Sequence, residues 1–562
     1  MQKTCRNPWC KQPFEVTDAD LDLLDRVSPM LAGAKYALPP PTHCPDCRQQ
    51  RRLSYRNERC FYRRKCDKTG KEMVSVYSDD KECIVYDQVV WWSDDWDQLA
   101  TGRAYDFKRP FFEQFHDLSL VAPRPCIVNM SSENSAYTNH SAYNKNCYMC
   151  INTGYCEDCF YTSDFTPDSR NCADCLAVQK CERCYECVDC KQCAFSTYLH
   201  ECINCTNCSF CYDCQGCSDC FGCWNLRHKR YCINNEQLTK DAYEAKLKVL
   251  HPVTWKAAQE QCARFQKDVA ERALHKALVL EHCENVTGDH LAHCKNCHNC
   301  FYVFESEDCA YCYDTGMVKN CLDTLEPLRG ELQYESHGCN LGYSLCVCSK
   351  CYECKSVLYS QYCWYCTDCF GCFGLRNKKY CIFNKQYTKE EYETLVPKVI
   401  DAMCKAGEWG HFFPISLSPF GYNETAAHRY YPLKREAAWE RKWRWRDQKE
   451  DSPKVSKVIP AAQLPTTIDD TPDDILDWAI ECARTKRPFR IVKQELEFYR
   501  ANGLPIPYLH PDERFQRRAL LRNPRHLWRR TCAKCGEGIE TTYAPDRPEM
   551  IYCEACYLKE VY

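Results

Sequence analysis

The sequence predicts a mixed, β-rich fold with small α parts, in which two small terminal modules flank a duplicated, cysteine-rich middle. Three observations predict it. Most of the 52 cysteines in the 562 residues lie three positions from another cysteine. The two ends of the chain resemble each other, and so do two long stretches between them. Mean hydropathy is −0.60 although 45% of residues are hydrophobic, because cysteine and 37 tyrosines make up much of that fraction. Apolar cores should therefore be small and need another source of folding energy.

The terminal units, predicted at 1-100 and 473-562, align without a gap over residues 51–66 and 517–532, at an offset of 466 residues. Upstream, Lys11-Gln12-Pro13-Phe14 pairs with Lys486-Arg487-Pro488-Phe489. Such self-similarity indicates one structural unit that is used twice. Each copy has room for two four-cysteine sites, and the two copies retain different ones.

The N-terminal copy retains its first site, and the C-terminal copy retains its second. The retained candidate metal ligands are Cys5, Cys10, Cys44 and Cys47 in one copy and Cys532, Cys535, Cys553 and Cys556 in the other. In the N-terminal copy the lost site keeps only Cys66, and the other three ligand positions are occupied by Thr69, Asp87 and Val90. In the C-terminal copy the lost site keeps only Cys482, and the other positions are occupied by Thr485, His510 and Glu513. CxxC pairs separated by 17 residues, as in the C-terminal copy, are typical of zinc, which takes four thiolates in a tetrahedron. With the short helices expected after Cys44 and Cys553, each module would be a zinc ribbon or treble clef.

The middle of the chain is a second duplication, in which residues 130–248 reappear as 280–397. We expect cysteine-rich repeats at 130-250 and 280-400, each closed by a helix that begins near Thr239 or Thr388, because threonine is a good helix N-cap. An aromatic and basic segment with a proline-punctuated linker fills 401-472.

Between Cys202 and Cys223 a cysteine recurs at every third residue, a period that suits neither an α-helix nor a strand. The period favours a β-solenoid with cysteines along an interior ladder. Two alternatives stay open: cysteines that pack as small hydrophobic side chains, and further metal sites. The candidate ligands for such sites are Cys202, Cys205, Cys220, Cys223, Cys294, Cys297, Cys351, Cys354, Cys369 and Cys372. An iron–sulfur cluster is disfavoured, because the ferredoxin pattern ends in Cys-Pro and the only such pair here is Cys44-Pro45.

The N-terminus has no apolar signal segment, and no run of 18 apolar residues occurs in the chain. We therefore expect a cytoplasmic location, where reduced thiols bind metal rather than form disulfides. Walker, GxGxxG, HExxH and GxSxG motifs are absent from the sequence. A four-thiolate zinc site leaves no open position for catalysis, so an enzyme is disfavoured, and no small-molecule substrate or membrane partner is indicated.

Arginines recur at helical spacing in both terminal units, and in the N-terminal unit they follow the Cys44–Cys47 knuckle directly. They are Arg48, Arg52, Arg56, Arg59 and Arg63, and their counterparts Arg514, Arg518, Arg522, Arg525 and Arg529. One arginine-rich helical face beside a zinc module suits the phosphate backbone of RNA or DNA, although Pro524 should end the second helix early. The alternative is a solvated face paired with acidic neighbours. The segment from Trp439 to Arg446 also interleaves aromatic and basic residues, as single-stranded nucleic-acid sites do, although packing of these tryptophans is the commoner case.

The N-terminal CKQPF and PPPTHCPDCRQQRR segments resemble the probable zinc-ribbon domain family. The full arrangement, with its CFGC-x-x-LRNKxYCIFN and RNPRxLxxRxCxKCG phrases, resembles large, uncharacterised cysteine-rich zinc-binding proteins of candidate-phylum bacteria. This resemblance covers nearly the whole chain. It implies zinc and a bacterial origin but no activity.

The sequence thus predicts a non-enzymatic protein with several zinc ions that binds nucleic acid, with RNA favoured, through arginines on its terminal modules. The alternatives are a structural or assembly protein in which metal sites replace an apolar core and the arginines meet protein carboxylates, and a metal or thiol reservoir.

Overall fold

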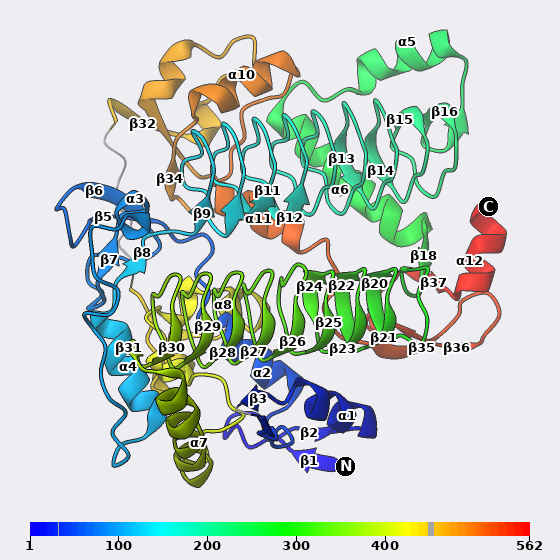
Figure 1. Cartoon of the computed structure of the whole chain (residues 1–562). Coiled ribbons are helices and arrows are strands. Elements are labelled where there is room, and N and C mark those ends of the chain that lie inside the picture. The colour runs from blue at the N-terminus through cyan, green and yellow to red at the C-terminus, as the bar shows by residue number, and fades with distance from the viewer. Residues whose placement is uncertain (32, 448–454) are drawn as a thin grey trace. The chain divides into compact units, whose positions relative to one another are not determined.

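The computed structural model describes residues 1–31, 33–447 and 455–562, and these form two compact units (Figure 1). Unit 1 joins residues 1–128 to residues 279–447, and unit 2 joins residues 129–278 to residues 448–562. Each unit therefore combines one terminal module with the cysteine-rich repeat from the other half of the chain. The structure is β-rich with few helices, as the sequence predicts.

The repeat in unit 2, here called the first ladder, is a stack of short parallel strands that ends in one antiparallel strand at Glu236–Gln237. Its strands pair at intervals of 12 residues, for example Thr197 with Ser209 and Ser218 with Arg230. Single parallel bridges such as Tyr185 with Thr197 continue the same spacing between the longer strands. The strands are β9 (Asn129–Met130), β10 (Ser141–Ala142), β11 (Ile151–Gly154), β12 (Ser163–Pro167), β13 (Thr197–His200), β14 (Ser209–Tyr212), β15 (Ser218–Phe221), β16 (Arg230–Ile233) and β17 (Glu236–Gln237).

The repeat in unit 1, the second ladder, has the same 12-residue interval, as in the pairs Lys319 with Glu331 and Glu331 with Tyr343. One sheet runs β21-β23-β25-β26-β27-β28-β29-β30-β31 and another β19-β20-β22-β24, and Figure 1 shows their strands stacked in chain order. The strands are β19 (Leu280–Glu281), β20 (Gly288–Ala292), β21 (Lys295–His298), β22 (Cys300–Phe304), β23 (Glu307–Ala310), β24 (Tyr313–Gly316), β25 (Lys319–Leu322), β26 (Glu331–Tyr334), β27 (Tyr343–Cys346), β28 (Lys355–Leu358), β29 (Thr367–Phe370), β30 (Lys379–Ile382) and β31 (Lys385–Gln386).

A bend at every third residue explains the spacing of the cysteines. Arg183, Glu186 and Asp189 have left-handed φ angles of 52°, 54° and 51°, and each directly precedes a buried cysteine. Four such three-residue segments make one 12-residue turn, so the cysteines of successive turns lie above one another. A left-handed φ is unfavourable for these residue types. The bends are held by hydrogen bonds between turns, such as Asn204 N–H to Lys191 O at 3.0 Å.

Each ladder ends in a helix, as predicted. Helix α5 (Lys240–Leu250) begins after Thr239, whose side chain accepts a hydrogen bond from the Ala242 N–H. Helix α7 (Lys389–Ala406) begins after Thr388 in the same way. Unit 2 adds α6 (Trp255–Arg272), which packs on β14, and β18 (Leu274–Lys276), which pairs with β37 (Met550–Tyr552) of the C-terminal module.

The terminal modules contain short hairpins and helices. In unit 1 these are β1 (Gln2–Thr4), β2 (Pro13–Glu15), α1 (Asp18–Val27), β3 (Met30–Leu31), β4 (Ala34–Lys35), α2 (Pro45–Leu53), β5 (Tyr62–Lys65), β6 (Glu72–Ser75), β7 (Val85–Tyr86), α3 (Gln88–Trp92), α4 (Phe111–Val121) and β8 (Arg124–Pro125). After the second ladder, unit 1 adds α8 (Ala426–Tyr430) and α9 (Arg435–Glu440). In unit 2 they are β32 (Lys457–Pro460), β33 (Trp478–Glu481), β34 (Pro488–Phe489), α10 (Lys493–Ala501), α11 (Pro511–Ala519), β35 (Trp528–Thr531), β36 (Gly538–Thr541), β37 and α12 (Glu554–Val561).

Helix α2 starts directly after Cys44 and α12 directly after Cys553, which confirms the two predicted helices. Part of the predicted linker, residues 448–454, lies outside the described residues. None of the helices in the described part of the chain is long and apolar enough to span a membrane.

Candidate metal sites and buried arginine clusters

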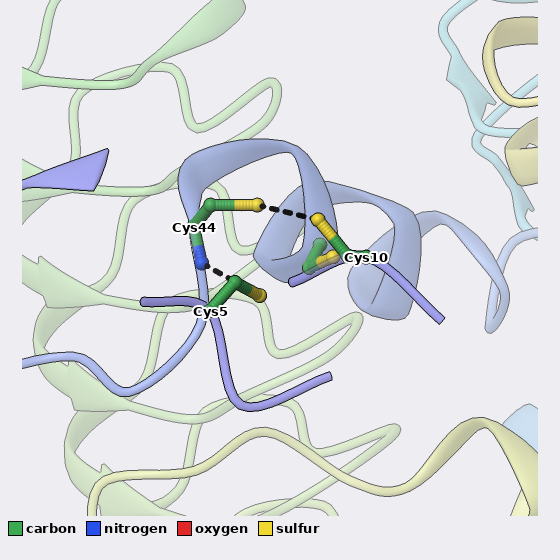
Figure 2. Close-up of side chains that lie close together, drawn as sticks. Cys5, Cys10 and Cys44 are labelled. Atoms are coloured by element: carbon green, nitrogen blue, oxygen red, sulfur yellow. Dashed lines mark hydrogen bonds between the residues drawn. The ribbon is translucent and has the colours of Figure 1, made fainter. Parts of the chain in front are cut away.

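The N-terminal cysteines form one of two compact groups of potential metal ligands. The sulfurs of Cys5, Cys10, Cys44 and Cys47 all lie within 4.8 Å of one another. Figure 2 shows the sulfurs of Cys10 and Cys44 facing each other, 3.7 Å apart. A tetrahedral ion with bonds of about 2.3 Å to sulfur would separate its ligands by about 3.8 Å, so the group fits such an ion. Burial raises the pKa of Cys10, so metal uptake there would release protons.

The C-terminal cysteines form the second group, from a hairpin and the start of α12. The sulfurs of Cys532, Cys535, Cys553 and Cys556 also lie within 4.8 Å of one another, with 3.8 Å between those of Cys535 and Cys553. Burial acts to raise the pKa of Cys532, but hydrogen bonds from backbone N–H groups outweigh it and lower this pKa to about 6. The thiolate, which is the ligand form, is therefore favoured at neutral pH.

Each lost site keeps the backbone hydrogen bond of a metal knuckle but only one of its four cysteines. In the two complete groups, the Cys44 N–H donates to the Cys5 sulfur and the Cys553 N–H donates to the Cys532 sulfur, both at 3.3 Å. The lost sites repeat this contact at 3.3 Å, from Asp87 N–H to Cys66 and from His510 N–H to Cys482. The His510 side chain accepts a hydrogen bond from the Asp512 N–H at the start of α11. The predicted alignment of the four sites therefore agrees with their local geometry.

The ladder cysteines are arranged differently. Among the described residues, three or more potential ligand atoms lie within 4.8 Å of one another in the two terminal groups. The ten candidate ladder ligands belong to neither group. Except for Cys223, which donates to the Phe221 carbonyl, their thiols donate to backbone carbonyls nine residues ahead, for example Cys205 to Cys214 O at 3.3 Å and Cys354 to Cys363 O at 3.4 Å. Burial raises the pKa of Cys190 and of Cys346 well above the usual value. Hydrogen bonds from neighbouring thiols lower the pKa of Cys205 and of Cys297, so the neutral thiol is favoured at the first two positions and the thiolate at the other two.

The arginines at the start and end of α2 point into unit 1 rather than to solvent. Arg48 and Arg52 lie on α2 and are about 2% exposed or less. Both form ion pairs with Asp323 of the second ladder, the Arg52 pair at 3.2 Å. Arg52 also pairs with Glu335 at 3.3 Å. Burial acts to raise the pKa of Glu335, but the neighbouring arginines outweigh it and lower this pKa.

Unit 2 repeats this cluster with its own residues. Arg514 and Arg518 lie on α11, are buried, and both pair with Asp174 of the first ladder, Arg518 at 2.9 Å. Arg518 is also 3.4 Å from Glu186. Asp174 and Glu186 precede Asp323 and Glu335 by the same 149 residues, so arginines and carboxylates were duplicated together.

These contacts correct the prediction for the arginine stripes. Arg48, Arg52, Arg56, Arg514 and Arg518 cannot meet a nucleic-acid backbone, because each is buried in ion pairs within its own unit. Arg522 is mostly buried and pairs with Asp189. The helices end at Leu53 and Ala519, so the later arginines do not share the helical face. Arg59 and Arg525 are half-buried, whereas Arg63 and Arg529 are exposed, so for these two nucleic-acid binding stays a prediction.

The acidic partners were missed at the sequence level. For two pairs the signal was present, since Asp174 and Glu186 recur as Asp323 and Glu335 while most neighbouring side chains differ. Asp189 does not recur, because Gly338 stands at its equivalent position. The sequence did not indicate which repeat each terminal module packs against.

Comparison with known proteins adds no assignment: no protein-family model matches the chain, and no curated protein matches it. The resemblance to cysteine-rich bacterial zinc proteins therefore stays a prediction.

Proposed function

We propose that the protein is a non-enzymatic, metal-stabilised structural protein that acts as a scaffold for assembly. In this proposal, one zinc ion in each four-cysteine group folds a terminal zinc-ribbon or treble-clef module, and buried arginines fix that module on a β-solenoid. The observation that carries the proposal is the pair of buried arginine–carboxylate clusters, in which the side chains of Arg48, Arg52, Arg514 and Arg518 are no more than 3% exposed. Side chains committed to holding the fold together in this way serve structure rather than recognition.

The 12-residue interval supports the solenoid part of the proposal, because it stacks equivalent side chains in rows along each ladder. On the outer face of the second ladder, Lys319 and Glu307 pair at 2.9 Å and are about half exposed. Rows of this kind present a regular, charged surface to a protein partner. The reservoir alternative is less well supported, because the ladder thiols are almost fully buried and bonded to backbone carbonyls, which blocks rapid metal exchange.

The proposal is tested by removing metal while following hydrogen–deuterium exchange along the full chain. Because structural zinc supplies folding free energy to its module, chelation should speed amide exchange in residues 1–53 and 528–562. The strands of the second ladder around Cys351 and Cys369 should stay protected, since no metal is assigned there. Unchanged exchange in both modules after metal loss would contradict the proposal, as would unfolding of the ladders alone.

Nucleic-acid binding is a second candidate, through the aromatic and basic segment rather than the arginine stripes. Trp439 is 52% exposed with the Arg435 guanidinium 4.7 Å from its ring centre. It lines a surface hollow together with Lys442 and Arg444. Trp443 is less available for stacking on a base, because its ring is stacked on that of Tyr422, with the ring centres 5.2 Å apart. An exposed aromatic ring beside basic side chains suits single-stranded RNA.

The test of this candidate is binding of a single-stranded RNA at two salt concentrations. We expect Trp439→Ala combined with Lys442→Glu to weaken binding at least tenfold, and wild-type affinity to fall steeply with salt. Phe195→Ala with Arg183→Glu is the matched control, because Phe195 is also about half exposed under an arginine. Equal losses in both double variants, or affinity that ignores salt, would exclude this site.

A further inference from the structure

Unit 2 contains a cavity of about 230 Å³ beside the first ladder. Its walls come from β13, β14, α6, the end of α11 and the segment after β36. Aromatic and aliphatic side chains form most of the lining, including Tyr198, Tyr212 and Phe265. A mostly apolar cavity with a few polar groups is the usual form of a small-molecule site.

Two charged groups in the wall, Arg517 and Glu186, form no ion pair with each other. Arg517 lines the cavity and makes no ion pair with any residue that the structure describes. Glu186 is 7% exposed, and its Oε1 has no hydrogen-bond partner in the described parts of the chain. A buried carboxylate oxygen without a donor is costly, so a ligand that brings a donor to this oxygen would gain the hydrogen bond that the protein leaves unmade.

At the equivalent position in unit 1 the two charged groups are paired. Arg51 and Glu335, the counterparts of Arg517 and Glu186, form an ion pair at 3.0 Å. Tyr55 and Tyr77 pack on other aromatic rings, with ring centres 5.6 Å apart for Tyr55 and Phe412 and 5.1 Å apart for Tyr77 and Phe420. Their counterparts in unit 2, Leu521 and Tyr543, line the cavity instead. The two copies therefore differ at this place: in unit 2, Arg517 has no ion-pair partner among the described residues, and one of the two Glu186 oxygens has no hydrogen-bond partner there.

The far wall is a fixed polar network and not part of the recognition pair. The His275 ring lies 2.9 Å from the Tyr212 hydroxyl and 3.0 Å from the Tyr543 hydroxyl. Its other nitrogen donates to the Val269 carbonyl at 3.1 Å, and Arg547 is paired with Glu549. With these groups occupied, Arg517 and Glu186 are left to bind the polar ends of a ligand.

We infer that this cavity binds a small aromatic acid that also carries an N–H or O–H donor. Its carboxylate pairs with Arg517, its ring lies against Tyr198 and Phe265, and its donor reaches the free oxygen of Glu186. The inference does not rest on the proposed scaffold function: Glu186 also belongs to the ion-pair cluster of unit 2, but through its other oxygen, which lies 3.4 Å from Arg518, and no metal takes part in the binding.

The test uses indole-3-carboxylate as the probe and the metal-loaded full chain, with binding measured by titration calorimetry. We expect one saturable site. Indole-3-carboxamide, which lacks the charge, and 1-methylindole-3-carboxylate, which lacks the donor, should each bind at least tenfold more weakly. Arg517→Gln should remove the preference for the acid over the amide. Arg230→Gln, a change at an exposed arginine elsewhere in unit 2, should preserve that preference.

A second experiment fills the cavity with a larger side chain. Ala270→Trp, from the α6 wall, should abolish binding, and Gln266→Trp at the exposed rim serves if the first variant does not fold. The inference is overturned if acid and amide bind the wild type equally, or if a folded, filled variant still binds. It is also overturned if the wild type shows no saturable binding up to about 5 mM, a weaker affinity than a ligand of this size ordinarily achieves.

Discussion

Replacing Asp323 by alanine is expected to lower the free energy of unfolding of unit 1 by about 3–5 kcal/mol. Asp323 is fully buried and pairs with both Arg48 and Arg52. Its loss leaves the buried Arg48 guanidinium without its carboxylate partner, and it leaves the buried Arg52 guanidinium with Glu335 alone. Denaturant unfolding of the full chain, with hydrogen exchange to separate the two units, measures the effect.

The control for this change is Asp308→Ala in the same ladder. Asp308 pairs with Arg26 at 3.0 Å, but the arginine side chain is 53% exposed, so the loss should be at most about 1 kcal/mol. Replacing Asp323 by leucine together with methionine at Arg48 and Arg52 should recover much of the stability, because no charge is then left buried without a partner. Equal effects of Asp323→Ala and Asp308→Ala would contradict the buried cluster.

Replacing Cys532 by serine is expected to remove one metal ion from the chain and to unfold the C-terminal module around α12. The reason is that a four-thiolate site loses affinity and folding free energy with any ligand. Metal content by mass spectrometry and trypsin cleavage after Lys534 and Lys559 follow the two effects.

Cys482→Ser is the matched control, since Cys482 holds the equivalent knuckle contact in the lost site of the same module. It should leave the metal content unchanged. In unit 1 the test variant is Cys5→Ser and its matched control is Cys66→Ser, because the Cys66 sulfur accepts a hydrogen bond from the Asp87 N–H at the lost site. Metal loss caused by Cys482→Ser or Cys66→Ser would show that the lost sites still bind an ion.

Local features of the fold were readable from the sequence. The threonines at Thr239 and Thr388 start the closing helices, and the cysteines at Cys44 and Cys553 start α2 and α12. The two four-cysteine groups assemble as the spacing indicated. These features depend on neighbours along the chain or on a duplicated pattern, which the sequence displays directly.

The pairing of modules with repeats was not readable, and that is why the arginines were misassigned. Arg52 meets Glu335, 283 residues away, and nothing local to α2 indicates this partner. A helix with arginines on one face looks the same in sequence whether that face meets phosphate or a carboxylate of the same chain. The period of three could be read from the sequence, but its cause, a left-handed bend that recurs at every third residue, as at Arg183 and Glu186, required the backbone.

Native mass spectrometry of the protein, purified without added metal and without oxygen, tests the central claim most directly. The account predicts two zinc ions per chain, one lost in Cys5→Ser and the other in Cys532→Ser, with all ladder cysteines free of metal. Iron with sulfide, zinc beyond two ions that survives both substitutions, or a folded protein that carries no metal would contradict it.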